Sequence, residues 1–549
     1  MRTGFITISI MVILAVIGIS FYSLIRTLAV FDPSYTIIDR WFSIILILGE
    51  VFLFVHGLGY AIDVLKATRK YAEKVKKYFV RPTGSKIAVF IAAFNEEQDV
   101  LKETIASASN FDYERKEIYL LDDSTKDPLR TAAEELAQRY KIRYIHRINR
   151  RGFKAGAIND ALKFIDAKYL LVLDADQRAS PEFLRRTAQL LEEDPKLAFV
   201  QVPQSYSNFD NSVAKSAAHQ QSIFFEYISE GKNVSNAMFS CGTNVMYRIE
   251  HLLAIGGMDE GTVTEDIATS FKLHEIGCKS EYFNKVYVDG EGPSTLAAYF
   301  TQQFRWSLGT LMLAKHIFRK MITHPRSMKV GQWWEYFLSS TWYLNGWAYF
   351  FLMISSISFL LLGIRPLIID PIIYAMAFVP YLLFNVFFFY SSMGKRGWSA
   401  KWTWLGTSLT LITFPVYMRA AVSALLGKKA TFGVTQKGKT PGAGIPLTKL
   451  WPQLVMLTFC FASTAVGLTY ISFFIDFSLL TNTVGAIYNA TLPLTLFSFS
   501  KLPAVTEYIQ PLGLLTNPSP HIDYSVVATT IWVTYHAIQL SAVFYLNKR

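Results

Sequence analysis

The stretch "KYLLVLDADQ" at residues 168–177 places an apolar run directly before two aspartates. A short apolar run of this kind is typical of a strand that is buried on both faces of a sheet. Residues i and i+2 of an extended segment share a face, so Asp174 and Asp176 are expected to direct both carboxylates at one point. Such a pair suits Mg²⁺ or Mn²⁺, although a solvated turn at a strand end would also explain it.

The segments on the N-terminal side of this stretch alternate between strand and helix patterns. Strand patterns occur in "KIAVFIAAFNEE" (86–97), "EIYLLDDST" (117–125) and "KIRYIHRI" (141–148), and helical patterns lie between them. This alternation predicts an α/β fold with a parallel-rich sheet covered on both faces. Such sheets bind ligands beyond the carboxyl ends of their strands. The polar residues expected at those ends are Asn95, Asp122, Asp123, Asp174 and Asp176.

The composition predicts a membrane protein with one large soluble domain. The chain has 549 residues, of which 51% are hydrophobic, and its mean hydropathy is +0.25. Long apolar runs lie near both ends, whereas residues 66–330 have an ordinary globular composition. The net charge of +12 comes largely from basic residues that flank the apolar runs. The positive-inside rule explains this pattern, so we do not expect nucleic acid as a partner. Three cysteines without metal-ligand spacing predict no disulfide framework.

The apolar runs and their flanking charges predict six spans in the cell membrane, with the soluble domain in the cytoplasm. An apolar segment after residue 400 is expected to lie in the membrane plane, because a span there would carry the following lysines outside. The predicted divisions are two transmembrane helices in 1–65, the soluble domain with interfacial helices in 66–330, two transmembrane helices in 331–394, the in-plane helix in 395–430, a polar loop in 431–445, and two transmembrane helices in 446–549 around an external loop at 476–523.

Two further motifs lie in the second half of the soluble domain. In "TVTEDIATSFKLHEIG" (262–277), Glu265 and Asp266 precede an apolar pattern at helical spacing. N-capping alone would explain one acid at that position. In "QQFRW" (302–306), an Arg–Trp pair lies on an amphipathic stretch, where such a pair could also be an interface anchor.

The joint order of these motifs resembles that of processive family-2 glycosyltransferases, most closely cellulose synthase catalytic subunits. The matching motifs are DD (122–123), DAD (174–176), TED (264–266) and QxxRW (302–306). The segments "KAGAIN" (154–159), "FSCGTNVMYR" (239–248) and "FGVTQKG" (432–438) are also similar to segments of that family. The resemblance covers roughly residues 40–475.

The resemblance implies a GT-A type domain that transfers a hexosyl group with inversion and depends on Mg²⁺ or Mn²⁺. Asp266 would be the general base, with Glu265 beside it, and Asp174 and Asp176 would hold the metal. The acceptor would contact Trp306, Cys241 and Gly242. The nucleotide sugar would contact Asn95, Asp122, Asp123, Lys154, Asp174, Gln302 and Arg305, together with Thr435 and Lys437 of a gating loop at 431–445.

UDP-glucose, a growing β-linked polysaccharide and membrane lipid are the expected partners. Four departures from the cellulose synthase pattern leave the sugar open, and chitin, mannan or hyaluronan-type polymers remain alternatives. These departures are Gln177, Ala157, Gln303 and Ser240. Transfer to a lipid carrier is a further alternative, and a transporter or scaffold is disfavoured by the intact acidic motifs. The chain ends soon after its last expected span, so no PilZ domain that binds cyclic-di-GMP is expected, and partner subunits stay undetermined.

Overall fold

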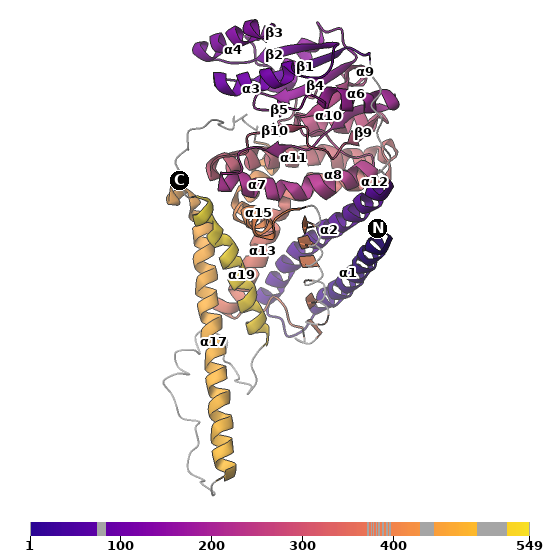
Figure 1. Ribbon diagram of the computed structural model, residues 1–549. Coiled ribbons are helices and arrows are strands. Elements are labelled where there is room, and N and C mark those ends of the chain that lie inside the picture. Colours follow the sequence, from indigo (N-terminus) through magenta and orange to yellow (C-terminus); the bar gives the residue numbers. More distant parts are fainter. Residues whose placement is uncertain are drawn as a thin grey trace.

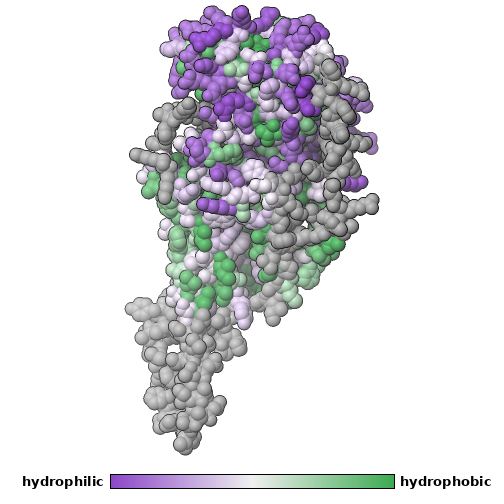
Figure 2. All heavy atoms as spheres, viewed as in Figure 1, coloured by the Kyte–Doolittle hydropathy of each residue, from purple (hydrophilic) through white to green (hydrophobic). Residues whose placement is uncertain are grey.

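A computed structural model describes residues 2–73, 84–369, 397–428, 444–490 and 524–547, together with scattered positions between 370 and 396. An α/β domain follows two N-terminal helices, and further helices follow it in the chain (Figure 1). Hydrophilic residues dominate the surface of the α/β domain, whereas hydrophobic residues gather on the helices that extend from it (Figure 2). This division matches the predicted soluble and membrane regions.

The α/β domain contains a seven-stranded sheet with the order β3-β2-β1-β4-β8-β6-β9. Only β8 runs antiparallel to its neighbours, so the predicted parallel-rich sheet is confirmed. Its strands are β1 (Ile87–Ala93), β2 (Lys116–Asp122), β3 (Arg143–His146), β4 (Tyr169–Asp174), β6 (Leu197–Gln201), β8 (Val245–Arg248) and β9 (Lys279–Tyr282). A second sheet joins β5 (Arg178–Ala179), β10 (Val288–Gly290) and β7 (Ser205–Tyr206).

Strand β4 is buried on both faces, as its apolar run predicts. Leu171 and Leu173 belong to one hydrophobic core, and Leu170 and Val172 belong to the core on the opposite face. The helices of the domain are α3 (Gln98–Ser109), α4 (Asp127–Arg139), α5 (Phe153–Leu162), α6 (Phe183–Glu193), α7 (Ser212–Ile223), the π-helix η1 (Phe224–Ile228), α8 (Ser229–Val234), α9 (Ile249–Ala254), α10 (Glu265–Glu275) and α11 (Leu296–Thr323).

Five helical stretches of the described chain are long and apolar enough to cross a membrane, or six if a bent pair counts as one span. The helices of this region are α1 (Arg2–Ala29), α2 (Ile37–Glu73), α12 (Val330–Thr341), η3 (Trp342–Leu344), α13 (Asn345–Leu362), α15 (Ala400–Ile412), α16 (Phe414–Leu425), α17 (Trp451–Ala490) and α19 (Tyr524–Leu546). The expected span at 371–393 falls mostly outside the described residues, so the count of six and the orientation stay predictions.

Two membrane elements differ from the sequence prediction. The expected in-plane helix is two helices, α15 and α16, bent by 42°. The bend lies before Pro415, which has no backbone N–H to continue the helical hydrogen bonds. Helix α17 continues to Ala490, so the first part of the expected external loop at 476–523 is helical. The rest of that loop lies outside the described residues.

Candidate active site

The first turn of α10 carries the two acids of the TED motif. The backbone N–H of Ile267 donates to Oδ1 of Asp266 at 2.8 Å. Burial, followed by the charge of Glu265, raises the pKa of Asp266 to about 7. Burial also raises the pKa of Glu265, against the opposing charges of Lys154 and Arg305. The site therefore holds a carboxyl group that exchanges its proton near neutral pH.

Lys154, in the first turn of α5, connects the DAD motif to the FSCGT segment. Its Nζ donates to Oδ1 of Asp174 at 2.5 Å and to the carbonyl oxygen of Gly242 at 2.7 Å. Gly242 has a φ of +81°, and a Cβ atom there would lie 3.1 Å from Oδ2 of Asp266. The absence of a side chain at Gly242 thus keeps the space next to Asp266 open.

The two aspartates of the DAD motif do not share one extended segment, which corrects the geometry expected from the sequence. Strand β4 ends at Asp174, and Asp176 lies in the following turn. Oδ2 of Asp176 accepts the backbone N–H of Glu291 at 3.1 Å, and its Oδ1 accepts from Nε2 of Gln177 at 3.4 Å. Because Asp176 lies in a turn, the rule that residues i and i+2 of a strand share a face does not apply to this pair.

Asp174 and Asp176 are the residues that would hold a divalent ion together with substrate phosphates. Asp174 and Asp176 offer hard carboxylate oxygens, and Mg²⁺ typically takes one or two carboxylates together with substrate phosphates. Within the described ranges there is no group of three or more His, Cys, Asp or Glu side chains that could form a complete protein cage.

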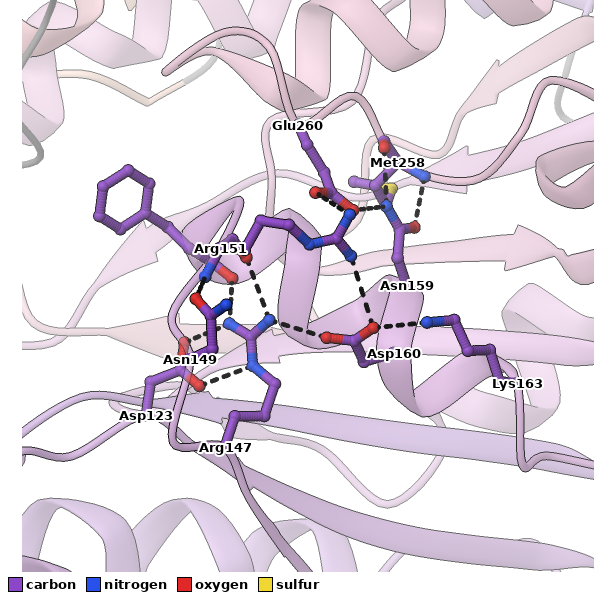
Figure 3. Close-up of polar contacts among 10 residues, drawn as sticks. Asp123, Arg147, Asn149, Arg151, Asn159, Asp160, Lys163, Met258 and Glu260 are labelled. Carbon is purple, nitrogen blue, oxygen red and sulfur yellow. Dashed lines mark hydrogen bonds and ion pairs between the residues drawn. The ribbon is translucent and has the colours of Figure 1, made fainter.

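The DD motif lies at the end of β2, and both side chains are engaged in hydrogen bonds. Asp122 accepts the hydroxyl of Tyr144 at 2.8 Å and the backbone N–H of Ser124 at 2.9 Å. Asp123 accepts two hydrogen bonds from the guanidinium of Arg147, from Nε at 2.9 Å and from Nη2 at 2.6 Å (Figure 3). Such bidentate pairing fixes the orientation of both planar groups.

Arg147 is a site residue that the sequence analysis missed. It also donates to the carbonyl oxygens of Arg151 at 3.1 Å and Phe153 at 2.8 Å, and to Asp160 at 3.1 Å (Figure 3). These bonds hold the backbone on both sides of Gly152, which has a φ of +66° and directly precedes α5. Arg147 thus connects Asp123 to the turn that positions Lys154.

Asn95 shapes the loop that follows β2. It has a φ of +54°, a conformation that Asn tolerates better than most residues. Its Oδ1 accepts the backbone N–H groups of Thr125 at 3.0 Å and Lys126 at 3.1 Å. The side-chain amide therefore joins the ends of β1 and β2.

The QxxRW residues share one face of α11, because residues three and four apart lie side by side on a helix. Oε1 of Gln302 is buried and has no hydrogen-bond partner among the described residues. Gln303 points elsewhere, and its Oε1 accepts the hydroxyl of Tyr417 from α16 at 2.9 Å. Helix α11 also packs directly on the TED segment, because a Cβ atom at Gly309 would lie 2.6 Å from Cγ2 of Thr264.

Cys241 lies close to Asp266 of the TED motif. Its backbone N–H donates to Oε1 of Gln201 at 2.8 Å. Burial, followed by the charge of Asp266, raises the pKa of its thiol, so the thiol is neutral at physiological pH. Thr435 and Lys437 lie outside the described residues.

The structure therefore places several predicted site residues close enough to form hydrogen bonds with one another or to influence one another's pKa. They are Lys154, Asp174, Cys241, Gly242, Glu265, Asp266 and Arg305. Asp122, Asp123 and Asn95 support the neighbouring edge of the sheet. The roles of all these residues in binding and catalysis remain predictions.

Comparisons with known proteins show which families the chain resembles. Residues 82–309 match the family model described as "Glycosyltransferase like family 2". The cellulose synthase catalytic subunit [UDP-forming] of Pseudomonas fluorescens (strain SBW25) is 28% identical over 365 residues, which are 64% of this chain and 47% of that protein. The protein of the same description from Xanthomonas axonopodis pv. citri (strain 306) is 30% identical over 275 residues, 48% of this chain and 35% of that protein. The chain thus spans less than half the length of these curated relatives.

Among solved structures, a mannosyltransferase from Pyrobaculum calidifontis in complex with GDP-Man and Mn²⁺ aligns with 70% of this chain and 100% of its own, at 15% identity and a TM-score of 0.49. The motif order, the parallel-rich sheet and the match over residues 82–309 together carry the assignment. On this evidence residues 82–309 are similar to glycosyltransferase family 2, and the chain as a whole resembles cellulose synthase catalytic subunits.

Proposed function

We propose that this protein is a membrane-embedded, processive, inverting glycosyltransferase that polymerises a β-linked glycan from a nucleotide sugar. Cellulose-like β-1,4-glucan made from UDP-glucose is the favoured product. The observation that carries the proposal is that the predicted motifs meet at one point. Lys154 donates to Asp174 and to the carbonyl oxygen of Gly242. A Cβ atom at Gly242 would lie 3.1 Å from Oδ2 of Asp266, and burial raises the pKa of this carboxyl group to about 7. A base with a pKa near the operating pH combines correct protonation with sufficient driving force for proton transfer.

In the proposed reaction a hydroxyl oxygen of the acceptor attacks the anomeric carbon of the donor. The bond from that carbon to the diphosphate oxygen breaks, the electron pair leaves with UDP, and the hydroxyl proton passes to Asp266. Attack from the face opposite to the leaving group inverts the anomeric carbon, so an α-linked donor gives a β-linked product.

The residues around Asp266 suit the charges of this reaction. Lys154 and Arg305 are cationic and lie close enough to influence the acids of the TED motif, so both could stabilise the charge that develops on the diphosphate. Asp174 and Asp176 would hold Mg²⁺ or Mn²⁺, which would neutralise the diphosphate when bound. Trp306 offers a flat apolar face on which a pyranose ring of the acceptor could pack.

The membrane helices and the loop at 431–445 complete the proposal. The α/β domain would lie in the cytoplasm, and the helices would form the path by which the polymer leaves. Thr435 and Lys437 could bind the diphosphate, and variants Thr435→Ala and Lys437→Ala are expected to reduce polymer output. If both variants make as much polymer as the wild type, the segment is better explained as a basic loop that contacts lipid headgroups.

A panel of nucleotide sugars tests the proposal most directly. The purified full chain, with Mg²⁺ or Mn²⁺, is incubated with UDP-glucose, UDP-N-acetylglucosamine and GDP-mannose, and both the released nucleotide and the product length are measured. We expect long chains from UDP-glucose and loss of activity with EDTA. Long chains from another donor would reassign the sugar, and short lipid-linked products would instead support the lipid-carrier alternative. If no nucleotide is released from any of the three donors, the proposed transferase activity is refuted.

A further inference from the structure

A buried cluster of charged side chains lies where membrane helix α2 meets the α/β domain. Nζ of Lys66 on α2 lies 2.6 Å from Oε1 of Glu335 on α12 and 3.4 Å from Asp63. Nζ of Lys232 on α8 lies 3.2 Å from Oε2 of the same glutamate. Glu335 is fully buried and Lys232 is only 3% exposed. Glu335 therefore bridges a membrane helix and a helix of the α/β domain.

Serine hydroxyls complete the cluster. Lys66 donates to Oγ of Ser235 at 2.9 Å, and Lys232 donates to Oγ of Ser339 at 2.8 Å. A buried ion pair stabilises only where its geometry is good and its remaining groups are hydrogen-bonded. The helices also approach closely, because a Cβ atom at Gly231 would lie 2.4 Å from Cβ of Asp63. Figure 1 shows α12 beside the end of α2 that adjoins the α/β domain.

The residue that follows Glu335 makes a second connection, to the helix that carries the proposed base. The hydroxyl of Tyr336 is hydrogen-bonded to Nδ1 of His274 at 2.7 Å, and Nε2 of His274 is hydrogen-bonded to Oγ of Ser280 at 3.0 Å. Burial lowers the pKa of His274 to about 3, so the imidazole stays neutral and both bonds persist at physiological pH. The Tyr336 ring also packs edge-on against Phe271 of α10, with 5.0 Å between centroids.

Consecutive residues on an α-helix point about 100° apart, so Glu335 and Tyr336 contact different partners. Through Glu335, α12 is fixed to α2 and α8, and through Tyr336 it is fixed to α10, whose first turn holds Asp266. We propose that Glu335 and Tyr336 are positioning residues for the transfer reaction, because together they set the place of α10 relative to the membrane helices. This inference rests on the proposed function, with Asp266 as base.

Tyr336→Phe is the sharpest test, because it removes one hydroxyl and keeps the ring that packs on Phe271. We expect kcat for UDP release to fall about three- to tenfold, less than the ~10²-fold that a misplacement of 1 Å can cost, because the ring packing against Phe271 is kept. KM for the nucleotide sugar should stay unchanged, because the donor-binding residues are not altered. Tyr113→Phe is the matched control, since Tyr113 is also buried and donates to the carbonyl oxygen of Ser85 at 2.6 Å, away from α12. An equal loss of kcat in both variants, or wild-type kcat in Tyr336→Phe, would overturn the proposal.

Glu335→Gln tests the first connection, from α12 to α2 and α8, with Glu50→Gln as its control. Glu50 on α2 is a poorly exposed carboxylate that pairs with Arg26 at 3.2 Å and accepts the hydroxyl of Tyr22 at 2.7 Å, and both partners lie on α1. The two connections act in series, so the double variant Glu335→Gln/Tyr336→Phe should lose no more kcat than the worse single variant. The proposal would be contradicted if the loss of kcat in the double variant equalled the product of the two single losses, or if Glu50→Gln lost as much kcat as Glu335→Gln. An inactive wild-type protein would instead refute the proposed function itself.

Discussion

At the scale of single residues, the placement of Asp266 favours reactivity at the expense of stability. Its folded-state pKa of about 7 lies above the value of 3.8 for an ordinary aspartate, so the folded chain holds this proton more tightly than the unfolded chain. The free energy of unfolding that depends on this group therefore falls as pH rises from about 4 to 7. Burial of this carboxyl group therefore lowers stability at neutral pH, as is common where a residue has a role in function, and the proposed role as base would account for it.

Asp266→Asn is accordingly expected to lose transfer and gain stability. UDP release should fall at least about 100-fold, because a general base typically contributes 10²–10⁴-fold. The unfolding temperature should rise, since Asn carries no charge to bury. Binding of UDP should survive. Turnover, UDP titration and thermal unfolding of the detergent-solubilised protein measure the three outcomes, and normal turnover would remove Asp266 from the mechanism.

The pH dependence of transfer follows from the same group. If Asp266 is the base, as proposed, it must be deprotonated to accept the proton, so kcat/KM should rise with pH and level off above about 7. Because the charge of Glu265 raises the pKa of Asp266, Glu265→Gln should move the midpoint of the profile to lower pH. A profile measured between pH 5.5 and 8.5 for both proteins checks this. A midpoint that stays in place, or moves upward, would contradict the pairing of the two acids.

Some residues of the candidate site could be predicted from the sequence, and others could not. The positions of Asp174, Asp266 and Arg305 follow from short motifs, so they could be predicted. Arg147 could not, because its partner Asp123 follows a different strand, 24 residues earlier in the chain, and the run "RINRRG" has no pattern that distinguishes it from its neighbours. The raised pKa of Asp266 likewise depends on burial by elements distant in the chain.

At the scale of elements, α11 and α10 form one packed unit around the TED segment. A Cβ atom at Gly309 would lie 2.6 Å from Thr264 and 2.7 Å from Val263, so this glycine lets α11 approach the residue that precedes Glu265. Helix α11 can therefore position Arg305 and the TED acids together only while position 309 lacks a side chain.

Gly309→Ala should push these elements apart. Overpacking of this kind typically costs about 1–3 kcal/mol, and displacement of the acids should lower kcat severalfold. Gly331→Ala is the control, because its Cβ would lie 3.8 Å from the nearest atom, in ordinary contact. That variant should keep its activity and gain slightly in stability. Equal activity of both variants in a UDP-release assay would show that α11 does not position the acids.

Elements were predictable where the pattern was long and local. Strands β1 to β4 follow from their sequence patterns, whereas β6, β8 and β9 were not predicted. The antiparallel direction of β8 depends on pairing with strands far away in sequence. The bend between α15 and α16 has a local cause in Pro415, yet the uniform apolar character of that segment suggested a single helix.

At the scale of the whole molecule, the α/β domain rests on the membrane region through α7 and α15. A Cβ atom at Gly406 of α15 would lie 2.8 Å from the backbone nitrogen of Gln220 and 3.0 Å from the carbonyl oxygen of Ser216. The side chain of Gln220 extends the contact, because it donates to Thr410 at 3.1 Å and accepts the hydroxyl of Tyr299 on α11 at 2.9 Å. A helix of the proposed acceptor site is thus linked to a membrane-region helix through α7.

Gly406→Ala should therefore separate transfer from polymer elongation. The contacting atoms belong to the α7 backbone and cannot rotate away, so α15 must shift, at a cost of about 1–3 kcal/mol. We expect UDP release to continue while the product becomes shorter, because the proposed exit path would no longer align with the site. Gly394→Ala, whose Cβ would meet no atom within 4 Å among the described residues beyond its own chain neighbours, controls for the added methyl group. Sizing of radiolabelled product from both variants decides the matter: chains of wild-type length from Gly406→Ala would show that the α7–α15 contact has no part in elongation.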